Sequence, residues 1–333
     1  MRITQRHPDV DADRLFRDFV PPPRFEGARF DTYDPQHPTQ TLAQSEVRRW
    51  ATARPRRWFH KKPPGPSAIY LDGGFGVGKT HLLVAALREG PHPRAFMSFS
   101  ELTFAIGLLG MDAVTDRFGR PGILCIDEFE LDDPGNTQMV ATFLERTMPK
   151  GLRIATTSNT PPKALGAGRF HVDHFRNRLS RIADSFHVIS VDGDDYRHRS
   201  VRSQITLPTS EYLTARFRAF EGRASMDSFP EVIEHLARIH PMRFAALLDN
   251  LDAVFLDQLH PLPDEATALR FAHFIDKLYD RQIALYCSGC TPFHLFEETW
   301  MVGPFAKKYG RTLSRMVELL NEHPSGENPT KSI

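Results

Sequence analysis

The sequence predicts an α/β protein built on a parallel, doubly wound sheet, followed by a C-terminal α/β and helical extension. Between residues 68 and 191, short apolar segments alternate with segments of helical periodicity, as in parallel sheets. Segment 122–126 is apolar without alternation, as expected of a strand buried on both faces. A glycine-rich loop joins the first apolar segment to a helical one. These observations together favour an open α/β sheet with a ligand site at one edge.

The composition is that of an ordinary globular chain. Its 333 residues contain 42 Lys and Arg against 41 Asp and Glu, so no overall charge favours a polyanionic partner. No apolar run approaches the roughly 20 residues that span a bilayer, and residues 1–13 lack a signal-peptide core. The three cysteines suit a reducing compartment better than a disulfide scaffold. We therefore expect a cytoplasmic protein without a transmembrane segment.

The N-terminal arm, residues 1–62, is rich in proline and basic residues. Residues 48–62 of this arm contain no acidic residue, and their basic residues are interleaved with the aromatic residues Trp50, Trp58 and Phe59. The basic residues are Arg48, Arg49, Arg54, Arg56, Arg57, Lys61 and Lys62. Such a stretch grips a nucleic-acid backbone and stacks on bases in some proteins. The alternative, favoured by the near-neutral chain, is a solvated face whose aromatic residues anchor the arm.

The glycine-rich loop fits the pattern G-x-x-x-x-G-K-[ST], between a strand at 68–71 and a helix at 81–87. Its glycines allow consecutive backbone N–H groups to face one phosphate at a helix N-terminus. Lys79 is expected to reach the β- and γ-phosphates of ATP, and Thr80 to bind Mg²⁺ through its hydroxyl. The predicted nucleotide-binding residues are Gly73, Gly74, Phe75, Gly76, Val77, Gly78, Lys79, Thr80 and His81.

Two adjacent acids, Asp127 and Glu128, follow the buried strand 122–126. This position is where ligands bind in open α/β sheets. Asp127 is expected to order the Mg²⁺ shell, and Glu128 to polarise the attacking water as general base. An exposed strand end with two ordinary acids is the alternative. The phosphate loop upstream favours the catalytic interpretation.

Polar residues beyond the next strand, 152–157, complete the candidate site. The amide of Asn159 is placed to hydrogen-bond both the γ-phosphate and the attacking water, unless it is only a turn residue before two prolines. Several arginines follow, and a guanidinium there can complete a neighbouring subunit's site. Arg169 is the first candidate for this role and Arg176 the next; Arg178 and Arg181 are further arginines of the same segment.

The C-terminal half repeats the strand–helix–strand order of residues 123–161, beginning about 130 residues later. Gln258 stands where Glu128 stood, and no phosphate loop precedes it, so this part is expected to extend or pack the sheet. Cys287 and Cys290, near His294, lack the second matching pair that a structural zinc needs. We interpret their spacing as a strand-end coincidence.

These patterns divide the chain into four parts. They are the arm 1–62, an ATPase core 63–200, a C-terminal extension 201–323 and a polar tail 324–333. A helix near residues 311–320 carries Arg315, which could fold back onto the bound nucleotide.

Together these motifs resemble the AAA+ superfamily of P-loop ATPases and, within it, the ZapE-type (AFG-like) ATPases of bacterial cell division. The resemblance spans most of the chain and rests on the phosphate loop, segments 126–129, 157–162, 169–170, 191–197 and 254–256, and residues 314–316. Segment 30–45 further resembles the lead-in that packs beside the adenine in many P-loop ATPases, although an arm covering the sheet edge is equally compatible.

The resemblance implies a ring-forming ATPase, usually taken as hexameric, that couples ATP hydrolysis to the remodelling of protein partners. Its implied partner is the tubulin-like division protein FtsZ. Asn159 would then be the sensor, Arg169 the finger acting in trans, and Arg315 the second sensor. The rival hypothesis is a DNA-binding helicase-loader or transposition-type ATPase that uses residues 48–62. A nucleotide-gated scaffold with little turnover is a third, which the intact pair of acids disfavours.

Overall fold

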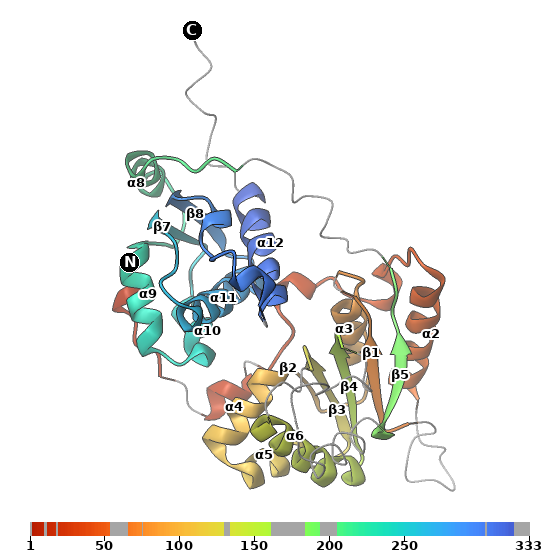
Figure 1. Ribbon diagram of the computed structural model, residues 1–333. Coiled ribbons are helices and arrows are strands. Elements are labelled where there is room, and N and C mark those ends of the chain that lie inside the picture. Colours follow the sequence, from red (N-terminus) through yellow and green to blue (C-terminus); the bar gives the residue numbers. More distant parts are fainter. Residues whose placement is uncertain are drawn as a thin grey trace, which may run out of the picture. The chain divides into compact units, whose positions relative to one another are not determined.

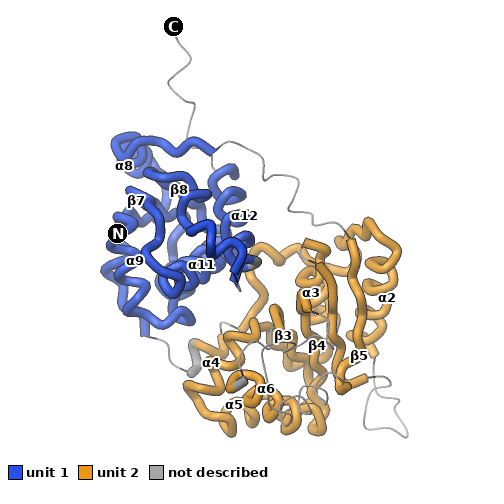
Figure 2. Tube along the Cα trace, viewed as in Figure 1, with its two compact units in different colours: residues 1–10, 197–333 blue, residues 11–196 orange. Residues whose placement is uncertain are grey.

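The computed structural model describes residues 2–9, 12–17, 19–53, 66–74, 76–129, 134–160, 184–193, 205–303 and 305–322. The chain forms two compact units, shown in different colours in Figure 2. We call residues 11–196 the core unit, and residues 1–10 with 197–333 the C-terminal unit. The four-part division made from the sequence stays a prediction.

The core unit contains a five-stranded sheet in the order β2-β3-β4-β1-β5, and every pairing is parallel (Figure 1). The strands are β1 (Ala68–Asp72), β2 (Arg94–Ser98), β3 (Gly122–Asp127), β4 (Leu152–Ser158) and β5 (Phe186–Ser190). The first strand in sequence thus lies inside the sheet, between β4 and β5. This topology confirms the predicted parallel, doubly wound fold class.

Helices cover both faces of this sheet. They are α1 (Ala12–Arg17), α2 (Pro38–Thr52), α3 (Lys79–Glu89), α4 (Phe99–Leu109), α5 (Met111–Phe118) and α6 (Pro134–Thr147). On one face, α2 and α3 pack on alternate strand residues such as Ile69, Ile123 and Cys125. On the other, the rings of Phe99 in α4 and Tyr70 in β1 meet Phe129 edge to face. Burial on both faces explains why β3 is almost continuously apolar, whereas the edge strand β5 exposes His187, Val188 and Ser190.

The C-terminal unit holds a second parallel sheet in the order β6-β7-β8. Its strands are β6 (Ala224–Ser228), β7 (Ala253–Leu259) and β8 (Ala284–Gly289), and its helices are α8 (Ser210–Arg218), α9 (Phe229–Arg238), α10 (Phe244–Leu247), α11 (Glu265–Asp280) and α12 (Ala306–Glu322). The apolar residues of α9, α11 and α12 form its main core, and Leu213 of α8 packs on the opposite face. The predicted α/β and helical extension is thereby confirmed.

The first residues of the chain belong to this C-terminal unit. Ile3 is fully buried among its apolar residues, and its backbone N–H donates to Asp227 Oδ2 at 2.9 Å. Thr4 donates to the other oxygen of the same carboxylate through its backbone N–H, at 3.2 Å, and through its hydroxyl, at 2.7 Å. The N-terminus therefore stabilises the end of β6.

Among the described helices, none is both long and apolar enough to cross a membrane.

Candidate active site

The phosphate loop follows β1 and ends at Gly78, the residue that caps the N-terminus of α3. Gly78 has a left-handed backbone, with φ 88°, and a Cβ there would lie 2.5 Å from Cε2 of Tyr33. At Gly73, a Cβ would lie 2.1 Å from the carbonyl oxygen of Val191. Each of the two positions therefore requires glycine, and the loop conformation that they allow is the one expected to direct backbone N–H groups at a phosphate. Phe75 lies outside the described residues.

Lys79 is the first residue of α3, and the structure brings it together with Asn159. Its ammonium group donates to the carbonyl oxygens of Gly73, at 2.9 Å, and Gly74. A third bond, at 2.9 Å, reaches the amide oxygen of Asn159, just beyond the end of β4. The Lys79 ammonium group thus bonds to three uncharged oxygen atoms. An anionic phosphate can replace these oxygens as its partner.

Thr80, Asp127 and Thr157 form a compact cluster of oxygen atoms at the ends of β3 and β4. The Thr80 hydroxyl lies 3.2 Å from each carboxylate oxygen of Asp127, and the Thr157 hydroxyl donates to Oδ1. The hydroxyl and carboxylate oxygens of Thr80 and Asp127 are the hard ligands that Mg²⁺ prefers, and phosphate and water would complete the octahedron. The two predicted metal ligands are therefore neighbours, and the donor set fits the cation.

Glu128 leaves β3 in a left-handed backbone conformation, with φ 52°. Its backbone N–H donates to the Thr157 hydroxyl at 3.1 Å, and the N–H of Phe129 donates to the Thr157 carbonyl at 2.7 Å. Phe129 is fully buried, so the chain is fixed on both sides of the half-buried Glu128. Left-handed non-glycine residues are uncommon and cluster at functional sites.

Asp72, at the end of β1, is an additional acid beside the loop that the sequence analysis did not identify. Burial raises the pKa of its carboxyl group, and the charge of Lys79 partly offsets this effect. Its position as the last strand residue before the glycines is a signal that could have revealed it. Thr157 was also missed, because its role depends on the pairing of β3 with β4.

The lead-in segment before α2 packs directly on the phosphate loop. The buried Tyr33 donates its hydroxyl to the carbonyl of Val77 at 2.9 Å, and its ring lies 5.4 Å from that of His81. His81 in turn lies 2.7 Å, through Nε2, from the carbonyl oxygen of Arg29. His81 therefore faces the lead-in segment, which braces the outer side of the loop.

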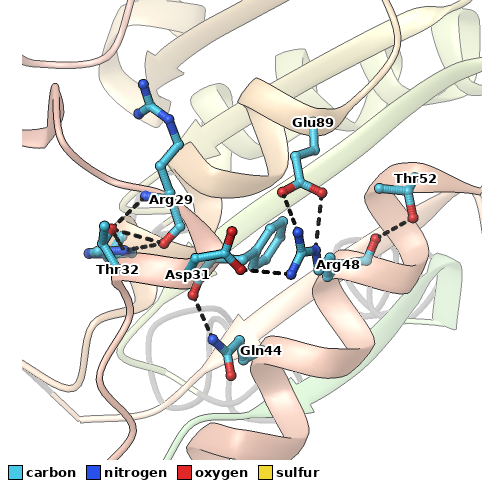
Figure 3. Close-up of polar contacts among 9 residues, drawn as sticks. Arg29, Asp31, Thr32, Gln44, Arg48, Thr52 and Glu89 are labelled. Atoms are coloured by element: carbon cyan, nitrogen blue, oxygen red, sulfur yellow. Dashed lines mark hydrogen bonds and ion pairs between the residues drawn. The ribbon is translucent and has the colours of Figure 1, made fainter.

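Two members of the basic segment 48–62 serve the fold of the core unit. The guanidinium group of Arg48 pairs with Asp31, at 2.9 Å, and with Glu89, at 3.2 Å, as Figure 3 shows. Trp50 is buried, donates to the carbonyl of Pro66, and stacks against the guanidinium of Arg153 at 4.2 Å. Trp50 is thus not presented for a nucleic acid, whereas Arg48 is an exposed side chain held in ion pairs. Residues 54–62 lie outside the described residues.

The arginines predicted as finger and second sensor fall in different parts of the chain. Arg169, Arg176, Arg178 and Arg181 lie outside the described residues.

Arg315 is buried in α12 of the C-terminal unit, where it pairs with Asp276 of α11 and lies 4.9 Å above the ring of Tyr279. Arg311 pairs with the same carboxylate at 2.9 Å. Although burial acts to raise the pKa of Asp276, the two arginines hold it well below its usual range. The sensor role of Arg315 stays a prediction.

Cys287 and Cys290 lie at the end of β8. Within the described part of the chain, no group of three or more His, Cys, Asp or Glu residues that could hold a metal occurs. Cys287 is buried in β8, where burial raises the pKa of its thiol, and His294 bonds to Thr291 instead.

Comparison with known proteins identifies the family. The family profile described as AFG1-like ATPase matches residues 12–221 and 213–325, which is most of the chain. The chain belongs to this family. It is accordingly an ATPase, as the loop and the two acids predicted.

Individual relatives share less than 25% sequence identity with this chain. The cell division protein ZapE of Escherichia coli K12 is 24% identical over 295 residues, covering 76% of this chain and 78% of that protein. ZapE of Escherichia coli O157:H7 matches equally. Among solved structures, DnaI is 18% identical with a TM-score of 0.41, over 52% of this chain and 93% of that one. The DnaC helicase loader is 22% identical with a TM-score of 0.36, over 51% and 99%.

Proposed function

We propose that this ATPase hydrolyses ATP with Mg²⁺ at the edge where β1, β3 and β4 end. The observation that carries the proposal is the convergence of Lys79, Asn159, Thr80 and Asp127 at that edge, with Glu128 beside them. Lys79 and Asn159 come from different elements yet share a hydrogen bond, so one phosphate group can contact both. The site supports phosphoryl transfer to water because it brings together a phosphate-binding lysine, ligands for Mg²⁺ and a candidate base.

Each side chain then has a distinct task. Thr80 and Asp127 would hold Mg²⁺, which when bound neutralises charge on the phosphates. Lys79 exchanges its carbonyl partners for phosphate oxygens and stabilises the charge that develops on them. Glu128 accepts a proton from the attacking water, and Asn159 orients that water against the γ-phosphate.

We further propose that the protein assembles into a ring, of six subunits as the resemblance implies, and remodels a protein client in the cytoplasm. The resemblance to ZapE-type ATPases implies FtsZ as that client, and the 24% identity to the cell division protein ZapE supports a role in cell division. Arg169 would complete the neighbouring subunit's site as the finger, and Arg315 would act as second sensor. DNA as a partner is less favoured, since Arg48 and Trp50 are engaged within the core unit.

The test uses Glu128→Gln to hold ATP without turning it over. We expect this variant to sediment as a larger assembly with ATP than with ADP, and to pellet with FtsZ polymers only when ATP is present. Lys79→Ala, which loses nucleotide binding, is the matched control. Unchanged sedimentation in ATP would contradict the ring, and binding to single-stranded DNA that weakens steeply with salt would favour the DNA alternative.

A further inference from the structure

The C-terminal unit repeats the strand arrangement of the core unit. In the core unit Ser98 of β2 pairs with Asp127 of β3, and in the C-terminal unit Ser228 of β6 pairs with Asp257 of β7. The same register therefore recurs about 130 residues later, with the same parallel order of three strands. Each serine directly precedes a helix, α4 or α9.

The helices on the sheets repeat as well. In the core unit, α3 packs on the face that carries Ile123 and Cys125 of β3. In the C-terminal unit, Leu213 of α8 packs on Ala253 and Phe255, the corresponding residues of β7. At the helix starts, Thr80 bonds to Asp127, whereas Ser210 lies 3.4 Å, between hydroxyl oxygens, from Ser288 of β8. The segments from α3 to β4 and from α8 to β8 thus share one architecture.

The closest correspondence lies at the strand ends. In the core unit the Thr157 hydroxyl donates to Asp127 and accepts the backbone N–H of Glu128 at 3.1 Å. In the C-terminal unit the Ser288 hydroxyl donates to Asp257 and accepts the backbone N–H of Gln258 at 3.0 Å. Both residues that follow the aspartate are left-handed, with φ 52° at Glu128 and 65° at Gln258.

The C-terminal unit forms this arrangement but lacks the residues proposed to bind and hydrolyse ATP in the core unit. The segment before α8, residues 205–209, contains neither glycine nor lysine, and Gln258 cannot act as a general base. The hydroxyl that links the aspartate to the next residue, from Thr157 or Ser288, is therefore a local feature of the strand ends and does not depend on a phosphate loop. Its effect in both units is to orient the aspartate and to hold the next residue in a conformation that non-glycine residues rarely adopt.

We propose that Thr157 is a positioning residue for ATP hydrolysis. One hydroxyl connects the proposed metal ligand with the proposed general base, because it donates to the carboxylate of Asp127 and accepts from the backbone of Glu128. Loss of the hydroxyl would free the backbone of Glu128 and shift its carboxylate, and small misplacements of a reacting group slow catalysis strongly. This inference rests on the proposed role of Glu128.

The test compares Thr157→Val, which removes the hydroxyl at similar size, with Thr157→Ser, which keeps the group that Ser288 supplies in the other unit. We expect Thr157→Val to lower kcat about 10- to 100-fold while changing the KM for ATP less than about threefold. Thr157→Ser should restore kcat to within about threefold of wild type. Ser288→Ala, the matched control, removes the equivalent hydroxyl from the C-terminal unit and should leave kcat unchanged.

Two outcomes would overturn the proposal: wild-type kcat in Thr157→Val, or an equal loss of kcat in Thr157→Ser. If Thr157→Val does not fold, Thr157→Ala measured by the same split of kcat and KM takes its place. Thr157→Val should slow the Glu128→Gln variant by a smaller factor than it slows wild type, because part of its effect acts through Glu128. Wild-type turnover in Glu128→Gln would reject the proposed base itself, a result distinct from failure of the Thr157 prediction.

Discussion

A partly buried histidine in the C-terminal unit should make the protein lose stability in mild acid. His273 of α11 lies within 2.8 Å, through Nε2, of the ammonium group of Lys308 in α12, so the neutral ring accepts that bond. Burial lowers its pKa to about 4, and the charges of Lys308, Lys277 and Arg311 act in the same direction while Asp276 opposes them. The folded protein therefore keeps His273 neutral where the unfolded chain, with a pKa near 6.5, becomes protonated.

The sign and size of the effect follow from this difference. Since the folded pKa lies below the unfolded one, the unfolded chain binds more protons, and stability falls as pH drops from about 6.5 towards 4. Between about pH 7.5 and pH 5 the loss attributable to His273 amounts to about 2 kcal/mol. Partial exposure of the ring makes this an upper value.

Urea unfolding followed by circular dichroism at both pH values measures the effect. The variant His273→Gln keeps a hydrogen-bond acceptor for Lys308 but cannot titrate, so it should lose about 2 kcal/mol less than wild type on acidification. His294→Gln, a change at an exposed ring, is the matched control and should behave as wild type. An equal loss of stability in wild type and His273→Gln would refute the reasoning.

Three further predictions concern packing around the site and the buried ion pair. Gly78→Ala should abolish ATP binding, measured by fluorescent-nucleotide titration, because the new Cβ would clash with the Tyr33 ring. The control Gly107→Ala, which places its Cβ in open space on α4, should bind ATP normally. Tyr33→Phe should weaken that binding about fivefold through loss of the bond to Val77, about 1 kcal/mol, and unchanged affinity would dismiss the bracing role. Asp276→Asn should lower the free energy of unfolding by about 3 to 5 kcal/mol, against about 0.5 for Glu234→Gln at an exposed pair; similar losses would contradict this.

The parts of the site that the sequence predicted are those fixed by local chain order. The phosphate loop requires a strand before it and a helix after it, so Lys79 and Thr80 could be placed from the motif alone. Asp127 and Glu128 follow an apolar run whose position at the sheet edge is a general property of parallel sheets. The repeat in the C-terminal half was also visible, because both halves show the same order of apolar segments.

The contacts that the sequence could not predict are long-range pairings. The bond from Thr157 to Asp127 depends on the register between β3 and β4, which one residue of slip would destroy. Burial of Ile3 in the C-terminal unit joins the two ends of the chain, and no local pattern signals it. Arg48 reads as a free basic residue until the fold places Asp31 and Glu89 beside it.

The central claim, that Glu128 is the general base, is tested most directly by Glu128→Gln. The C-terminal unit already carries a glutamine, Gln258, in the same left-handed conformation with the same bond to a hydroxyl, so the substitution should leave the backbone intact. Removal of a general base costs about 10²- to 10⁴-fold in rate. Measured together, ATP affinity should stay within about threefold of wild type while turnover falls by that factor. Turnover at the wild-type rate, with unchanged affinity, would contradict the assignment.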